Sequence, residues 1–169
     1  LSFLHMTYLA GELRFAKNDS ASIYTWGTTK IHMTLLEQAR KFREAFGQEI
    51  LDQVSRYGFV KSKLYQMQTS LVAEEATEFL KAADELYADP NNAQRKEEFL
   101  KELSDTVFVC YQFAAAFGFD LDTAMDRVFQ SNMSKLGPDG KPIYRADGKV
   151  LKGEGYKPPV LTDLYKWYD

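Results

Sequence analysis

Apolar residues recur at intervals of three and four along most of the chain, the spacing that places them on one face of an α-helix. A first helix is predicted from Thr34, a suitable N-cap, to a stop at Gly47. A shorter helical segment is expected over residues 50–58. Residues 60–88 contain no Gly or Pro and predict a long helix, which the turn-forming residues 89–92 end.

Two further helices complete the pattern. One is predicted over about 93–117, and another over 120–133 with Asp120 as its N-cap. Their short connections favour antiparallel neighbours. Residues 141–152 then indicate a small hairpin around an Asp-Gly turn. We therefore expect an all-α, four-helix-bundle-like fold with a small C-terminal β-hairpin arm.

The chain has 169 residues, which is enough for one domain with a proper core. Residues 1–30 show no clear period and are assigned as an N-terminal extension, either native or vector-derived. Residues 31–161 are expected to form the folded domain with its arm, and residues 162–169 a tail.

Two pairs of carboxylates interrupt the apolar stripes of the two longest helices. Glu75 and Glu78 form one pair, and Glu102 and Asp105 form the other. The i, i+3 spacing places both members of a pair on one helix face. Four carboxylates facing one core would repel one another and suffer desolvation unless a cation lies among them. The pattern therefore predicts a divalent metal site.

The residues around these acids narrow the choice of metal. No His or Cys lies near them in the sequence, which argues against zinc and copper, and oxygen ligands alone suit Mg²⁺ or Mn²⁺. Glu74 is a candidate to accept a proton from the attacking water or to hold a further ion. The alternative is a solvated acidic face, in which Lys81 pairs with Glu78 and Lys101 pairs with Asp105.

Composition excludes several classes of protein. The net charge of −3 argues against a general nucleic-acid binder, and no apolar run approaches the length of a membrane span. The start of the chain lacks the features of a signal peptide. Cys110 is the only cysteine, so no intramolecular disulfide forms and a reducing cytoplasm is the expected setting. We expect Cys110 to be a buried core residue.

The acidic motif resembles that of a known superfamily. Glu74-Glu75-x-x-Glu78 followed by Glu102-x-x-Asp105 is similar to the signature of the all-α, MazG-like NTP pyrophosphohydrolases, which include dimeric dUTPases and phosphoribosyl-ATP pyrophosphohydrolase. Three further strings resemble the tail of phage and bacterial single-domain MazG-like proteins: residues 131–135, 139–143 and 147–153. The resemblance covers about residues 34–161.

This resemblance implies an enzyme that hydrolyses a (d)NTP to the (d)NMP and pyrophosphate by Mg²⁺-assisted attack of water. It assigns the metal ligands to Glu75, Glu78, Glu102 and Asp105, with Glu74 and Glu75 as the catalytic acids. It also implies a homodimer or a homotetramer. Two alternatives stay open: a pyrophosphohydrolase acting on another substrate such as phosphoribosyl-ATP, and a non-catalytic helical interaction module.

Substrate contacts are expected from the end of the last helix and from the arm. Asn132 is suited to read a base or sugar edge, and Lys135 to hold a phosphate. Arg145 and Lys152 give the arm a positive face, although ordinary surface solvation is the alternative for each single cation. Gln68 is a candidate to line a base pocket.

Overall fold

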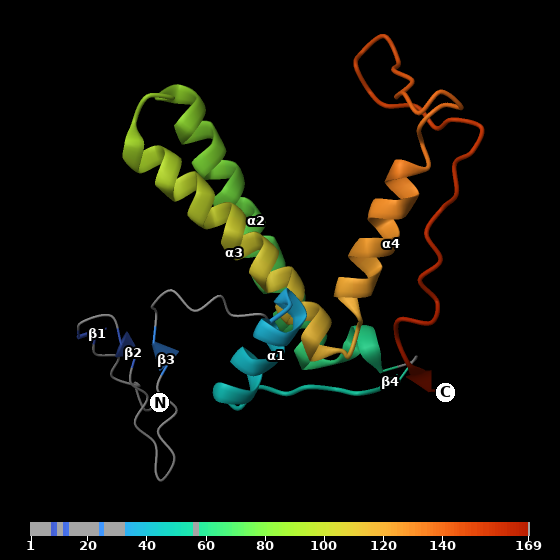
Figure 1. Ribbon diagram of the computed structural model, residues 1–169. Helices are drawn as coiled ribbons and strands as arrows, with labels where there is room; N and C mark the ends of the chain where they lie inside the picture. Colours follow the sequence, from blue (N-terminus) through green and yellow to red (C-terminus); the bar gives the residue numbers. More distant parts are fainter. Residues whose placement is uncertain (1–7, 10–11, 14–23, 26–32, 56–57, 169) are drawn as a thin grey trace. The chain divides into compact units, whose positions relative to one another are not determined.

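The computed structural model describes residues 8–9, 12–13, 24–25, 33–55 and 58–168. The chain divides into two compact units, Leu1–Met33 and Thr34–Asp169. In the first unit, three two-residue strands form an antiparallel sheet in the order β1-β2-β3, which the sequence did not predict (Figure 1). The strands are β1 (Tyr8–Leu9), β2 (Glu12–Leu13) and β3 (Tyr24–Thr25).

The second unit is built from helices, as predicted, and its described strands are only two residues long. The helices are α1 (Leu35–Ala45), the 3₁₀ helix η1 (Phe59–Lys61), α2 (Lys63–Ala88), α3 (Ala93–Ala116) and α4 (Leu121–Met133). The N-caps are local in origin. The Thr34 hydroxyl accepts from the Glu37 amide while the Glu37 carboxylate accepts from the Thr34 amide, a complete capping box. Asp120 caps α4 in the predicted place.

Helices α2 and α3 form a long antiparallel hairpin (Figure 1). The hydroxyl of Thr106 links the two helices midway along, because it donates to the carbonyl of Glu75 on α2 at 3.1 Å and to the carbonyl of Glu102 on its own helix at 2.9 Å. The predicted stripes of both helices therefore meet at this interface.

The core lies where α1 and the end of α3 meet the start of α2. One cluster of buried residues comprises Val54, Leu64, Ala116 and Phe117, and a second comprises Ala39, Tyr111 and Ala115. Arg43 is also fully buried, although its ordinary place is the surface. Its guanidinium donates to the Glu49 carbonyl at 3.0 and 2.6 Å, which ties the chain leaving α1 to the core.

The predicted helical segment over residues 50–58 is wrong. Val54–Ser55 forms the strand β4, which pairs in parallel with β5 (Trp167–Tyr168) at the other end of the unit. The reason is tertiary: the Val54 amide donates to the Lys166 carbonyl, so the C-terminal segment supplies the backbone partner that a local helix would have supplied.

Helix α4 diverges from the hairpin, and the chain after it returns along its length (Figure 1). Arg127 holds this returning segment by donating to both carboxylate oxygens of Asp163 and, at 2.8 Å, to the Val160 carbonyl. The predicted hairpin arm is present as a single antiparallel bridge between Tyr144 and Val150, with Gly148 at a positive φ in its turn.

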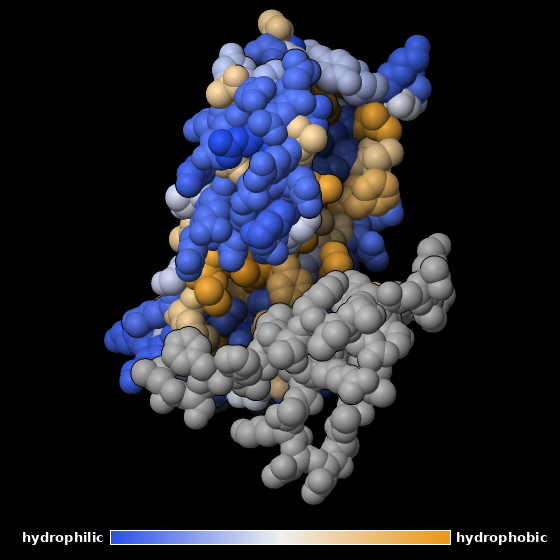
Figure 2. Space-filling model, turned by 90° about the vertical axis from the view of Figure 1, so that its left-hand side faces the viewer, coloured by the Kyte–Doolittle hydropathy of each residue, from blue (hydrophilic) through white to orange (hydrophobic). Residues whose placement is uncertain are grey.

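Hydrophobic residues remain on the surface of this unit. On the face drawn in Figure 2, they gather in patches beside a larger hydrophilic area. Exposed hydrophobic side chains of the hairpin include Leu80, Leu100, Leu103 and Val107, and those of α4 include Met125, Phe129 and Met133. Among the described residues, no helix is both long and apolar enough to cross a bilayer.

Candidate metal centre

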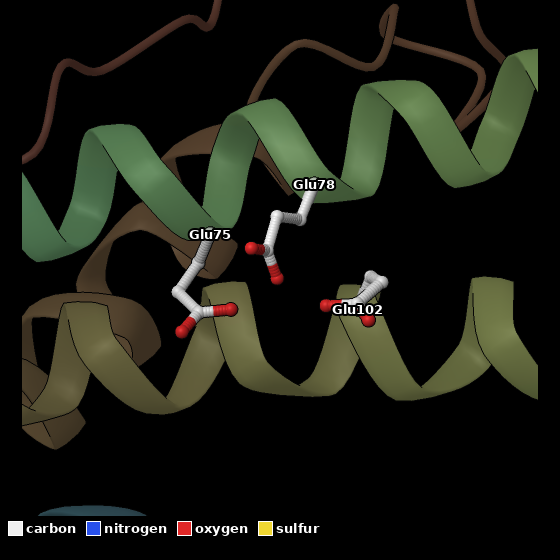
Figure 3. Close-up of side chains that lie close together, drawn as sticks. All are labelled: Glu75, Glu78 and Glu102. Atoms are coloured by element: carbon white, nitrogen blue, oxygen red, sulfur yellow. The ribbon is translucent and has the colours of Figure 1, made fainter.

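Three carboxylates converge between α2 and α3. Glu75 and Glu78 project from one turn of α2, and Glu102 projects from the facing turn of α3 (Figure 3). One oxygen of each lies within 4.8 Å of one oxygen of the other two. Two i, i+3 residues on one helix and one residue on its antiparallel neighbour thus form a compact group of carboxylate oxygens.

Burial makes this convergence costly without a cation. Glu102 is 4% exposed, and its Oε2 atom has no hydrogen-bond partner among the described residues. The carboxyls of Glu78 and Glu98 lie beside it. Ionised carboxylates repel one another unless they share a proton or a cation lies among them. An orphaned, buried carboxylate oxygen among further acids fits a divalent ion with oxygen ligands.

The environment shifts the pKa values of the acids in opposite directions. Desolvation first, and then the charges of Asp105, Glu78 and Glu102, raise the pKa of Glu75 above its ordinary value. The hydrogen bond from Lys101 lowers the pKa of Glu102, and the hydrogen bonds to Glu102 and Asp105 raise the pKa of Lys101. The centre therefore already attracts positive charge.

Asp105, the fourth predicted ligand, lies one turn along α3 from Glu102. Its Oδ2 atom accepts from the Lys101 ammonium at 3.0 Å, and Lys101 also donates to Glu102 Oε1 at 2.7 Å. Asp105 is not one of the three residues whose oxygens converge most closely. Glu74 is exposed on α2 and is not a member of that set either.

Lys101 and Lys81, which the solvated-face hypothesis pairs with Asp105 and Glu78, behave differently. Lys101 pairs with Asp105, as the solvated-face hypothesis expects, but it also reaches the buried Glu102. The acid nearest to Lys81 is Glu85, at 4.0 Å, whereas Glu78 was expected. Since Glu102 is buried, the acidic face is not simply solvated.

Hollows adjoin the acids on the hairpin surface. One, of about 520 Å³, has mainly apolar walls and includes Asp105 in its lining, together with Leu35, Leu103, Ser104, Val107, Phe108 and Tyr111. A second, polar hollow of about 230 Å³ is lined by Glu78, Lys81, Ala82, Glu85, Glu98 and Glu102. The predicted ligands thus line two hollows: Asp105 the apolar one, and Glu78 and Glu102 the polar one.

The prediction of a buried Cys110 is wrong. Cys110 is exposed in the wall of a third hollow of about 560 Å³, which residues of α2, α3 and the start of α4 line. Its position on α3 faces this hollow, whereas the neighbouring Tyr111 is buried in the core. Desolvation raises the pKa of the thiol, which disfavours the reactive thiolate.

The other predicted substrate residues form local contacts within the chain. Lys135 donates to Asn132 Oδ1 at 2.7 Å at the end of α4, Arg145 pairs with Asp147 in the arm turn, and the Lys152 ammonium lies 4.3 Å from the centre of the Tyr156 ring. Asn132 lies in the last turn of α4, and the other three lie in the segment that follows it, away from the hairpin (Figure 1). One chain therefore does not bring them to the carboxylates.

Gln68 differs from these four residues because it is 1% exposed inside the unit. Its Oε1 atom has no hydrogen-bond partner among the described residues. Glu98 lies beside the site and was not predicted, although its i, i+4 spacing to Glu102 was a signal.

The geometry can be compared with known proteins. A family model for phosphoribosyl-ATP pyrophosphohydrolase matches residues 39–132, which include all the predicted metal ligands. The chain belongs to this family. The predicted membership of the MazG-like pyrophosphohydrolase superfamily and the predicted enzyme class are thereby confirmed. No curated protein sequence matches the chain.

The chain is also similar to a solved structure. It is the crystal structure of a proposed NTP pyrophosphohydrolase from Exiguobacterium sp. 255-15, with 20% sequence identity, 80% of each chain covered and a TM-score of 0.36. We draw no functional conclusion from it.

Proposed function

We propose that the chain is a Mg²⁺-dependent nucleotide pyrophosphohydrolase that cleaves a (d)NTP between the α and β phosphates, giving the (d)NMP and pyrophosphate. The observation that carries the proposal is the buried, unpartnered Oε2 atom of Glu102 within the convergent acids. Mn²⁺ has the same ligand preference and is the other candidate ion.

Glu75, Glu78, Glu102 and Asp105 would hold the ion. When bound, a divalent ion supplies Lewis acidity and neutralises phosphate charge. Glu75 is also the candidate to accept the proton of the attacking water, because its carboxylate lies beside those of Glu78 and Glu102. Glu74, which is exposed on the preceding position, is retained as an accessory acid.

The apolar hollow beside Asp105 is the candidate site for the nucleobase. Its volume of about 520 Å³ lies within the usual range of small-molecule sites, roughly 300–1,000 Å³. A nucleotide seated there would direct its phosphates towards the acids. Such a hollow binds an adenine of phosphoribosyl-ATP as readily as that of a dNTP, and the family match favours phosphoribosyl-ATP as the second candidate substrate.

We further propose that the active form is a homodimer, or a tetramer of two dimers. The exposed apolar residues of the hairpin and of α4, such as Leu100 and Phe129, support a second copy as the covering surface. A partner would also bring Asn132, Lys135, Arg145 and Lys152 towards acids that one chain leaves apart. The reducing, cytoplasmic setting and the absence of a nucleic-acid partner stay predictions from composition.

A substrate panel tests this function. Purified full-length chain with Mg²⁺ is given dNTPs, NTPs and phosphoribosyl-ATP, and pyrophosphate and monophosphate are measured. We expect activity to fall at least 100-fold in Glu75→Gln and Asp105→Asn and to persist in Glu97→Gln, whose carboxylate is exposed on α3 outside the cluster. Release of orthophosphate and a diphosphate would contradict the cleavage position.

A further inference from the structure

The ammonium of Lys101 already occupies part of the proposed metal centre. Its Nζ atom lies 2.7 Å from Glu102 Oε1 and 3.0 Å from Asp105 Oδ2, so one cation bridges the two predicted ligands on α3. The two ends of this bridge differ in exposure. The Glu102 side chain is 6% exposed, whereas that of Lys101 is 56% exposed, so the ammonium reaches the buried acid from the solvent side.

A divalent ion on Glu102 could use its Oε2 atom, which is buried without a partner, while the ammonium of Lys101 is bonded to Oε1 of the same carboxylate. A metal on Glu102 and an ammonium at 2.7 Å from the same carboxylate would place like charges within a few ångströms, where repulsion is strong. The two cations therefore compete for one place.

We propose that Lys101 is a displaceable counter-ion. It neutralises Glu102 and Asp105 while the centre holds no metal, and it moves towards solvent when a divalent ion binds. This inference rests on the proposed metal site, but it adds a role that the four acids alone do not have. Lys101 sets the concentration of free metal at which the centre fills.

The exposed position of the ammonium favours this exchange. A lysine side chain is a flexible stem with a compact charge, and most of this one already lies in solvent. Water and salt screen the pair at this exposed end, which lowers its contribution. Removing the ammonium should therefore tighten metal binding by a modest factor, about two- to fivefold.

Calorimetric titration of MnCl₂ and MgCl₂ into the metal-free, full-length protein tests the proposal. Lys101→Met removes the charge and keeps the length of the stem. Lys81→Met is the matched control: Lys81 lines the polar hollow beside Glu78 and Glu102, but the acid closest to it is Glu85. We expect Lys101→Met to bind Mn²⁺ about two- to fivefold more tightly than the natural chain, and Lys81→Met to change by clearly less. Equal affinities for Lys101→Met and the natural chain, or an equal gain in both variants, would overturn the exchange.

Amine labelling gives a second readout that a purely structural lysine would not change. The natural chain is briefly acetylated at constant pH with and without Mn²⁺, and each lysine is quantified by mass spectrometry. Acetylation of Lys101 should increase with Mn²⁺ relative to Lys81 and Lys96, because the ammonium leaves two carboxylates. If calorimetry shows metal binding but acetylation of Lys101 decreases or stays the same, the displacement of Lys101 is contradicted and the metal site is not. No metal binding by the natural chain would instead overturn the metal site, and the exchange with it.

Discussion

Glu102→Gln should weaken the dependence of the protein's stability on Mg²⁺. The substitution keeps the shape of a side chain that is 4% exposed, but it removes the negative charge and replaces one oxygen by an NH₂ group that cannot bind a cation. In the natural chain, Mg²⁺ at 100 times its dissociation constant adds about 2.7 kcal/mol to the free energy of unfolding. For a chain of this length, that corresponds to a rise in melting temperature of about 5–11 °C.

The variant should keep only a part of this gain. Loss of an outer-shell partner typically weakens metal binding about 10–100-fold, so loss of a direct ligand should cost at least as much. At the same Mg²⁺ concentration the added stability falls to about 0.4–1.4 kcal/mol, or about 1–6 °C. Thermal unfolding with and without Mg²⁺ measures both values, and Glu97→Gln on the same helix controls for loss of one surface charge. An equal Mg²⁺-induced shift in Glu102→Gln and the natural chain would refute the assignment of Glu102 as a ligand.

Three further predictions concern the same fold. Glu75→Gln should raise the melting temperature of the metal-free protein at neutral pH, because the raised pKa makes the ionised form destabilising. The gain should be full above the raised pKa and vanish as the pH falls below the ordinary glutamate value; a gain that grows on acidification would contradict it. Gly118→Ala should destabilise the fold by more than the ~1–2 kcal/mol expected for Gly47→Ala. Both glycines have a positive φ, but only a Cβ at Gly118 meets the Leu51 carbonyl, at 2.7 Å. Chemical denaturation of the two variants measures the difference. Asp163→Asn should make the C-terminal segment more sensitive to limited proteolysis, because it weakens the charged pair with Arg127. Unchanged cleavage would argue that this pair does not hold the segment in place.

Helix prediction succeeded where the signal lies within a few neighbouring residues. Thr34 and Asp120 bond to amides three residues ahead, so their roles as N-caps depend on local sequence alone. The acidic pairs were predictable for the same reason, since i, i+3 spacing places their members on one face of any helix. The convergence of Glu75, Glu78 and Glu102 also required that α2 and α3 be antiparallel neighbours, which their short connection made probable.

Prediction failed where the partner is distant in the sequence. Residues 50–58 carry apolar spacing that suits a helix, but Val54 pairs with a strand at the end of the chain. Cys110 has apolar neighbours in sequence, yet its helix face looks into a hollow rather than the core. Arg43 is buried because a carbonyl at Glu49 and the amide of Gln112 surround it, and no pattern of residue types announces that arrangement.

The amino-acid sequence therefore contains the chemistry of this protein: four helices with their ends, an acidic motif on two of them, and membership of a pyrophosphohydrolase family. Tertiary structure alone decided what each helix face meets. It buried Glu102 without a partner for Oε2 and placed the residues of the arm away from the acids. The physical reason is that periodicity specifies the face of a helix, whereas solvent exposure and the distance between charges depend on what packs against that face.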